Sequence, residues 1–166
     1  MRILVTYGSK MGGTAGLARM LVDDVIAEGH YAEARPAAPR DDLSEFDAVV
    51  VGGALYSNRW HKDARRFVRR HASILKPMPV YFFSSGPLDD SAALDLIPPT
   101  SQVAKLMAGV DGRSHMTFGG RMPADAQGFP ASSMAKTNAG DWRDPEQVTR
   151  WARAILTDLA ALHPVG

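Results

Sequence analysis

The residues between Tyr7 and Gly16 combine hydroxyl groups and glycines at the start of a segment with helical periodicity. The stretch reads "YGSKMGGTAG" and directly follows the apolar run "RILVT". Glycines let the backbone approach a ligand closely, and the first N–H groups of a helix have no partner within that helix. Together with the hydroxyls of Ser9 and Thr14, such N–H groups suit a phosphate dianion. The chemistry predicted for this loop is therefore the binding of a terminal phosphate.

The glycine spacing excludes two common phosphate-binding motifs. The dinucleotide pattern G-x-G-x-x-G is absent because Gly8, Gly12 and Gly13 are spaced differently, and no glycine precedes a Lys-Ser or Lys-Thr pair. A monophosphate fits this loop better than a pyrophosphate. The alternative interpretation is that Ser9 and Thr14 only cap a helix and that the glycines form a turn.

Composition limits the classes of protein to which the chain can belong. Its 166 residues, 45% hydrophobic and 22% charged, suit one globular domain over residues 1–166. With 19 basic and 18 acidic residues the net charge is +1, so no global field attracts nucleic acid or an anionic membrane. The chain has no cysteine, and its histidines and carboxylates lack metal-ligand spacing, so we expect no metal. Without a signal peptide or an apolar run of roughly 20 residues, we expect a cytoplasmic protein with no transmembrane segment.

Short apolar segments alternate with helix-like segments along the chain. The predicted strands are "RILVTY", "YAEAR", "FDAVVVGGAL", "MPVYFFSSG" and "SHMTFGG". Parallel neighbours need crossover connections, so this alternation predicts an α/β fold with a doubly wound, five-stranded parallel sheet and helices on both faces. Ligands of such sheets bind beyond the carboxyl ends of the strands. The loops after Tyr7, Gly52 and Ser84 are therefore the candidate site.

Three longer segments have the periodicity of amphipathic helices, over 14–28, over 62–75 and from Asp144 onward, and a short helix is expected over 101–107. The residues predicted to face the core are Leu17, Ala18, Leu21, Val22, Val25 and Ile26 in the first helix, Ala64, Phe67, Val68, His71, Ile74 and Leu75 in the second, and Val148, Trp151, Ala152, Ile155, Leu159 and Leu162 in the last. Asp144 should cap the last helix, with Pro145 in its first turn and Gln147 completing a capping box.

Two stretches carry a resemblance to a known family. "SKMGGT", Ser9 to Thr14, resembles the S-x-x-G-x-T loop with which flavodoxins bind the phosphate of FMN. The stretch from Val50 to Ser84 is similar to flavodoxin-like, menaquinone-dependent protoporphyrinogen dehydrogenases. Its matching residues are Trp60–His61, Arg66–Phe67, Arg70–His71, Met78–Pro79 and Phe82–Phe83–Ser84, and "FGG" and "GDWRDPEQV" are similar further on. The resemblance implies a flavodoxin-like fold with strand order 2-1-3-4-5 and FMN as a noncovalent cofactor.

The resemblance also implies which residues bind FMN. They are Ser9, Lys10, Met11, Gly12, Gly13 and Thr14 at the phosphate, and Ala54, Leu55, Tyr56, Trp60, Ser85, Gly86 and Pro87 around the ring. Trp60 is the first candidate to cover one face of the ring and Tyr56 the second, the alternative being that both are packed loop aromatics. His61, next to Trp60, is a weak catalytic candidate that could bind substrate or stabilise reduced flavin, with a solvated loop residue as the alternative.

Two features favour an oxidoreductase over a diffusing electron carrier. The loop from Ser84 to Ser91 has no aromatic to stack on the flavin, which leaves room for a substrate. The chain is also near neutral. A typical flavodoxin that carries electrons between proteins, the class to which the resemblance points, is strongly acidic. The expected reaction is a two-electron oxidation at flavin N5, either protoporphyrinogen dehydrogenase-like or quinone-linked. The alternatives are an electron-transfer flavodoxin with a redox protein partner and a non-enzymatic binding domain, and a deazaflavin or other phosphorylated ligand could replace FMN.

One segment departs from the family pattern. Family members that use membrane quinones have an insertion rich in aromatic and basic residues before the last helix, whereas residues 121–140 here are polar and rich in Gly, Ala, Ser and Pro. This segment offers little apolar surface to a lipid interface. The cations Arg65, Arg66, Arg69 and Arg70 fit a solvated helix face, or else a surface for an acidic partner or nucleic acid, and we expect no nucleic-acid partner. A small molecule, a quinone or a redox protein remains the expected partner, and the sequence is compatible with a homodimer.

Overall fold

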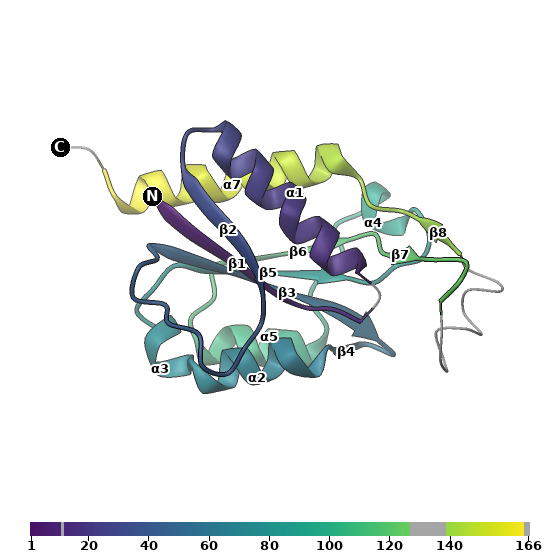
Figure 1. Cartoon of the computed structure of the whole chain (residues 1–166), viewed down its shortest axis with the longest axis horizontal. Coiled ribbons are helices and arrows are strands. Elements are labelled where there is room, and N and C mark those ends of the chain that lie inside the picture. The colour runs from purple at the N-terminus through teal and green to yellow at the C-terminus, as the bar shows by residue number, and fades with distance from the viewer. Residues whose placement is uncertain (11, 127–138, 165–166) are drawn as a thin grey trace.

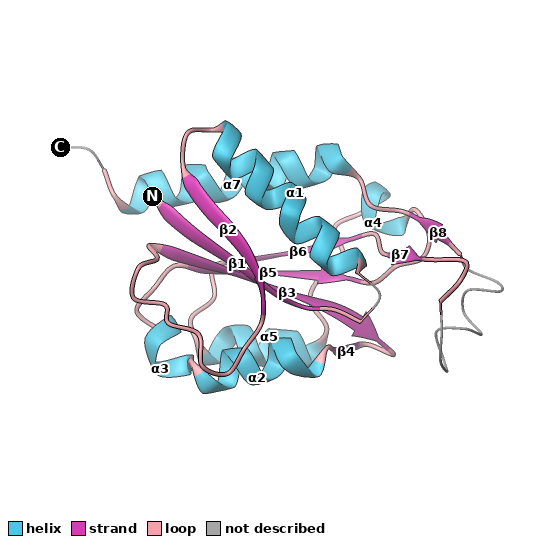
Figure 2. Cartoon of the chain, in the orientation of Figure 1, coloured by secondary structure: helices cyan, strands magenta, loops and turns pink. Residues whose placement is uncertain are grey.

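A parallel sheet forms the centre of the protein, and helices cover both of its faces (Figures 1 and 2). The structure is a computed structural model that describes residues 1–10, 12–126 and 139–164. The main strands are β1 (Arg2–Gly8), β2 (Tyr31–Pro36), β3 (Ala48–Tyr56), β5 (Val80–Ser85) and β6 (Ser114–Phe118). They are parallel and lie in the order β2-β1-β3-β5-β6, which confirms the predicted order 2-1-3-4-5. The labels differ because the two-residue strand β4 (Arg59–Trp60) pairs antiparallel with the end of β3.

The helices divide between the two faces of the sheet (Figure 1). On one face lie α1 (Gly13–Ala27) and α7 (Pro145–Leu162), and on the other lie α2 (Lys62–Arg70), α3 (Ala72–Leu75) and α5 (Ser101–Gly109). The short helix α4 (Ser91–Leu94) follows β5. Successive strand residues point to opposite faces, so neighbouring phenylalanines serve different cores. Phe83 contacts Trp151 of α7, with ring centroids 6.1 Å apart, and Phe82 contacts Trp60 on the other side, at 6.0 Å.

The prediction of a buried position is wrong for three residues. Ile26 is 52% exposed, Ile74 is 49% exposed and Leu162 is 40% exposed. Ile26 and Leu162 lie in the last turns of α1 and α7, and Ile74 lies in the one-turn helix α3. Periodicity shows which face of a helix is apolar, but it does not show where along the helix the covering element ends.

The predicted helix over 62–75 is interrupted at His71, which separates α2 from α3. The side chain of His71 is 4% exposed, as expected for a structural histidine. Its Nδ1 lies 2.9 Å from the carbonyl oxygen of Phe67, and its Nε2 lies 3.3 Å from that of Asp41. The imidazole therefore joins the end of α2 to the loop before β3.

The start of α7 agrees with the prediction at its cap but not at its capping box. A carboxylate oxygen of Asp144 accepts hydrogen bonds from the backbone N–H groups of Glu146 (3.0 Å) and Gln147 (3.4 Å), and Pro145 begins the helix. The side chain of Gln147 instead donates to the carbonyl oxygen of Ala92, at 2.8 Å. Gln147 is 8% exposed, and this long-range partner replaces the local one.

A small antiparallel ladder after β6 was not predicted. It pairs β7 (Arg121–Met122) with β8 (Gly140–Asp141), close to the carboxyl ends of the main strands (Figure 1). Most of the polar segment between them, residues 127–138, is outside the described residues. Among the described helices, none has the length and hydropathy needed to span a bilayer.

Candidate functional site

A pocket lies where the loops after the strands meet at the carboxyl edge of the sheet. Parallel register places Gly8 of β1 beside Gly53 of β3, and Ala54 of β3 beside Ser85 of β5. The loops that follow are thereby brought to one place, as the prediction required. The pocket is lined by Ser9, Gly13, Thr14, Ala54, Leu55, Tyr56, Ser85, Gly86, Leu88, Gly120, Arg121 and Met122.

Three further predicted site residues, Lys10, Gly12 and Pro87, lie in or beside the loops that form this pocket. Lys10 lines an adjoining groove, which shares Ser9 and Tyr56 with the pocket. Gly12 and Pro87 belong to the same loops as the pocket residues, and the carbonyl oxygen of Pro87 accepts a hydrogen bond from the N–H of Gly120. Met11 lies outside the described residues.

The loop before α1 leaves polar groups directed at the pocket without a partner in the fold. The Ser9 hydroxyl accepts a hydrogen bond from the N–H of Gly12 at 3.2 Å, and Gly12 adopts φ 82°, a left-handed conformation that favours glycine. Among the residues that the structure describes, no side chain forms a capping hydrogen bond with α1. Thr14 is 1% exposed, and its Oγ1 has no hydrogen-bond partner among the described residues. Neither hydroxyl acts as a helix cap, so the uncapped N–H groups and the Thr14 hydroxyl are available to an anion.

Trp60 does not occupy the position that the sequence suggested. Its side chain is 1% exposed and packs on Phe82, and a Cβ at Gly53 would overlap its ring. The cause is the pairing of Leu55 with Trp60, which folds the chain back after β3 and turns the indole into the core. This burial does not agree with the expectation that Trp60 covers a ring in the pocket, and Trp60 lines the adjoining groove instead.

Tyr56, the second candidate, lies on the rim instead. It lines both the pocket and the adjoining groove, and burial raises the pKa of its hydroxyl. The next two residues, Ser57 and Asn58, have positive φ values of 50° and 62° and form the tight turn between β3 and β4. This turn places Tyr56 and Trp60 on opposite sides of the hairpin, one at the pocket and one in the core.

His61 has a structural contact at the start of α2. The Nδ1 of its ring accepts a hydrogen bond from the backbone N–H of Asp63 at 3.2 Å. The backbone N–H of His61 donates to the carbonyl oxygen of Ala54 at 2.8 Å. Burial lowers the pKa of His61, which favours the neutral ring that such an acceptor requires. His61 lines the groove beside the pocket, and its geometry is that of a helix cap.

The sequence reasoning missed four pocket residues, Leu88, Gly120, Arg121 and Met122. Gly13 at the start of α1 lies against Arg121, because a Cβ on that glycine would come within 3.3 Å of the Arg121 backbone nitrogen. Arg121 thus lies at the pocket with its backbone against the start of α1. The available signal was the position of "FGGRM" after the last predicted strand, since that strand ends at the same edge of the sheet. Within the described ranges, no group of three or more His, Asp or Glu side chains is arranged to hold a metal ion.

Comparisons with known proteins agree with this architecture. Residues 4–125 match the sequence model of the family described as flavodoxin domain. Flavodoxin 2 from Bacillus cereus has 16% sequence identity and a TM-score of 0.65, covering 95% of this chain and 99% of that one. A flavodoxin from the domain Archaea has 15% identity and a TM-score of 0.62, covering 96% and 99%. At these identities the likeness shows the fold.

A curated relative shares part of the sequence. Protoporphyrinogen IX dehydrogenase [quinone] of Escherichia coli (strain K12) is 26% identical over 86 residues, which are 51% of this chain and 48% of the relative. The match thus spans about half the length of that enzyme. Because the family match covers most of the chain, the protein belongs to the flavodoxin domain family.

Proposed function

We propose that this flavodoxin-family protein binds FMN noncovalently and acts as an FMN-dependent oxidoreductase. The observation that carries the proposal is the buried, unpartnered hydroxyl of Thr14 at the uncapped start of α1, in a pocket at the carboxyl ends of the strands. A buried polar group without a partner costs free energy, so its presence in a pocket supports a ligand that accepts its hydrogen bond.

The loop from Ser9 to Thr14 would hold the FMN phosphate. The N–H groups of the first turn of α1 and the Thr14 hydroxyl would donate to the phosphate oxygens, and the positive end of the helix dipole favours the negative charge. Ser9 holds the loop closed through its bond to Gly12. Lys10, the second residue of this loop, is exposed and would add a positive charge near the phosphate.

Two further loops would hold the ring. Ala54, Leu55 and Tyr56 line one part of the pocket, and Ser85 and Gly86 line another. The two loops touch at one point, because a Cβ at Gly86 would lie 3.1 Å from the Cβ of Leu55. Tyr56 would cover one face of the ring, and it is the one aromatic among the described residues that line the pocket. The other face would then be open to a substrate.

Bound FMN would supply two-electron redox chemistry, because its ring accepts a hydride equivalent at N5. The protein would contribute binding, orientation and a partly enclosed site. The substrate class we favour is a reduced organic molecule, with a quinone or another acceptor completing the cycle. The partial match to protoporphyrinogen IX dehydrogenase supports a quinone-linked reaction of that kind.

Titration of the flavin-free protein with FMN and with riboflavin tests the cofactor and the phosphate loop together. We expect FMN to bind and Thr14→Val to weaken FMN roughly 10- to 100-fold, the usual worth of a hydrogen bond to a charged group, while riboflavin affinity stays unchanged. The matched control is Thr6→Val, since Thr6 is also buried with an unpartnered hydroxyl but is not among the pocket residues. Failure to bind either flavin, or equal FMN affinity in the wild type and Thr14→Val, would overturn the assignment.

Turnover separates an oxidoreductase from an electron carrier. After each reduction with dithionite under anaerobic conditions, the flavin-loaded protein should pass two electrons to a small quinone such as menadione, and the flavin absorbance measures this reoxidation. Tyr56→Ala, which removes the one described aromatic from the pocket, should change the flavin spectrum and this rate. A flavin-loaded protein that no small quinone reoxidises would count against the enzymatic assignment.

A further inference from the structure

Six cationic side chains without an acidic partner form a continuous surface next to the pocket. We call this the basic surface, and it consists of Arg59 of β4, Lys62, Arg65, Arg66 and Arg69 of α2, and Lys105 of α5. Within the described part of the chain, none of the six lies within 4.0 Å of a carboxylate oxygen. Elsewhere, Arg35, Arg113, Arg143 and Arg153 all have carboxylate partners. Other described cations, such as Arg19, Arg70 and Arg150, also have no carboxylate within 4.0 Å, but these six lie together on the neighbouring elements β4, α2 and α5.

The basic surface begins at the rim of the candidate site. The groove that shares Ser9 and Tyr56 with the pocket is also lined by Arg59, Lys62 and Arg65. A second groove, lined by Arg69 and Lys105, lies further along α2, where α5 runs beside it (Figure 1). The nine residues of α2 extend about 13 Å. Positive charge thus leads from the pocket rim along one whole helix.

The fold holds these charges close together. Arg65 is anchored by a hydrogen bond from its Nε to the carbonyl oxygen of Trp60, at 3.0 Å. Burial lowers the pKa of Arg65, and repulsion from Arg59, Arg69 and Arg66 lowers it further. Asp63 is the one carboxylate in α2, and it lies against His61 instead. Since the whole chain carries a net charge of only +1, this surface is a local excess of charge.

We propose that the basic surface docks an acidic face of a redox protein and so brings the electron-carrying group of that partner to the pocket rim at Tyr56. The inference rests on the proposed function. Each transfer would move one electron and no atom between the two proteins, oxidising the donor centre and reducing the acceptor centre. Complementary charge would raise the rate of encounter and fix the orientation of the partner.

The dimensions and the side chains favour a protein partner. A single small anion would contact two or three cations, whereas these six extend along a helix face. Sequence-tolerant binding of single-stranded nucleic acid uses exposed aromatic rings between the cations. Among the described residues, Tyr56 and the buried Trp60 line the groove of Arg59, Lys62 and Arg65, but no Phe, Tyr or Trp lines the groove of Arg69 and Lys105, so aromatic rings do not alternate with the cations along α2.

A binding measurement with an acidic [2Fe–2S] ferredoxin as the probe tests the proposal. Isothermal titration calorimetry on the flavin-loaded protein at low ionic strength should give an affinity that the double variant Arg66→Glu/Arg69→Glu lowers at least about tenfold. The matched control is Arg19→Glu/Arg150→Glu, which makes the same change in net charge on α1 and α7, on the opposite face (Figure 1). Arg19 and Arg150 are exposed and have no ion pair among the described residues, so we expect a change within about twofold.

Three results would overturn the proposal. The two double variants could lose affinity equally, which would indicate a general charge effect. The difference between them could persist at 1 M salt, where the screening length is about 3 Å and an electrostatic surface should lose its advantage. A single-stranded DNA oligonucleotide could bind more tightly than the ferredoxin and lose that affinity in Arg66→Glu/Arg69→Glu, which would assign the surface to nucleic acid. Flavin absorbance in each variant distinguishes these failures from failure of the proposed function, because neither charge pair lines the pocket.

Discussion

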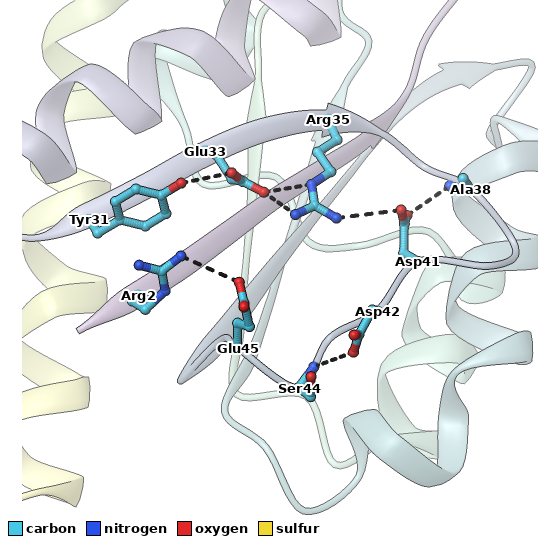
Figure 3. A network of polar contacts seen from close by, with 9 residues as sticks. All are labelled: Arg2, Tyr31, Glu33, Arg35, Ala38, Asp41, Asp42, Ser44 and Glu45. Carbon is cyan, nitrogen blue, oxygen red and sulfur yellow. Dashed lines mark hydrogen bonds and ion pairs between the residues drawn. The ribbon is translucent and has the colours of Figure 1, made fainter.

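The outer edge of β2 and the carboxyl end of the sheet differ in whether their polar side chains have partners within the chain. At the β2 edge, charged side chains pair with one another (Figure 3). Arg35 hydrogen-bonds Glu33 and lies 3.7 Å from Asp41, and the Tyr31 hydroxyl donates to Glu33 at 2.9 Å. Hydrogen bonds from Arg35 and Tyr31 lower the pKa of Glu33, as expected of a carboxylate whose charge is compensated.

At the carboxyl end, hydroxyl and cationic groups stay without such partners. Thr14 has an unpartnered hydroxyl in the pocket, and the basic surface has no carboxylate within reach among the described residues. The charged side chains at the β2 edge have partners within the folded chain. At the carboxyl end, the Thr14 hydroxyl and the cations of the basic surface have none among the described residues. The comparison teaches that unpartnered groups gather in the pocket and on the basic surface, where we propose an anionic ligand and an acidic partner, although Thr6 shows that such a group alone does not mark a site.

The largest effect should come from the aromatic pair on the hairpin at the carboxyl end. Trp60→Ala removes a fully buried side chain and should lower the free energy of unfolding by about 3–5 kcal/mol. Tyr56→Ala should cost about 1 kcal/mol, because that side chain lies at the pocket rim. Urea denaturation of both variants without flavin measures the difference. Equal losses would break the distinction between the packed and the ligand-facing side of this hairpin.

A partly buried polar pair between β5 and β6 should produce an intermediate effect that depends on pH. His115 Nε2 lies 2.9 Å from the Ser84 hydroxyl, and burial lowers the pKa of His115 to about 4. The unfolded chain, with a histidine pKa near 6.5, binds the proton more tightly, so stability is lost as the pH falls from about 6.5 to about 4. Partial exposure limits the expected loss to about 1–2 kcal/mol between pH 7 and pH 5.

Unfolding of His115→Gln at the two pH values isolates this contribution. The variant should lack that part of the pH dependence, while the contributions of Glu33 and the other carboxylates remain in both proteins. If the wild type and His115→Gln lost the same stability between pH 7 and pH 5, the depressed pKa would be wrong.

The smallest effects should come from removing one polar group in the pocket and one at the β2 edge. Without flavin, Thr14→Val should change the free energy of unfolding by less than about 1 kcal/mol, or stabilise the protein, because the lost hydroxyl has no partner. Glu33→Gln should cost less than about 1 kcal/mol because its ion pair is partly exposed, and the cost should shrink in high salt. A loss above 2 kcal/mol for Thr14→Val would show that its hydroxyl serves the fold rather than a ligand.

Much of the architecture could be predicted from local patterns. The five main strands, the cap at Asp144 and the structural role of His71 are present in the fold. The strand order, which the resemblance implied, is confirmed as well. Predictions failed where a distant element decided the outcome. Gln147 bonds to Ala92 instead of its own helix start, and Ile26 lies where α1 is no longer covered.

The candidate site divides in the same way. The loop from Ser9 to Thr14 could be found from the sequence because the turn, the hydroxyls and the helix start are neighbours along the chain. Arg121 is distant from this loop in the sequence and meets Gly13 only through the fold after β6, so its position after the last predicted strand was its one sequence signal.

By itself, the sequence determined the alternation of strands and helices and the chemistry of the phosphate-type loop, since both depend on residues a few positions apart. Only the tertiary structure decided that Trp60 is buried while Tyr56 faces the pocket, because the β3–β4 pairing turns the two rings to opposite sides. It also decided which charges are paired. Glu33 and Arg35 meet on one strand, whereas the cations of β4, α2 and α5 come together through long-range packing that brings them no carboxylate among the described residues.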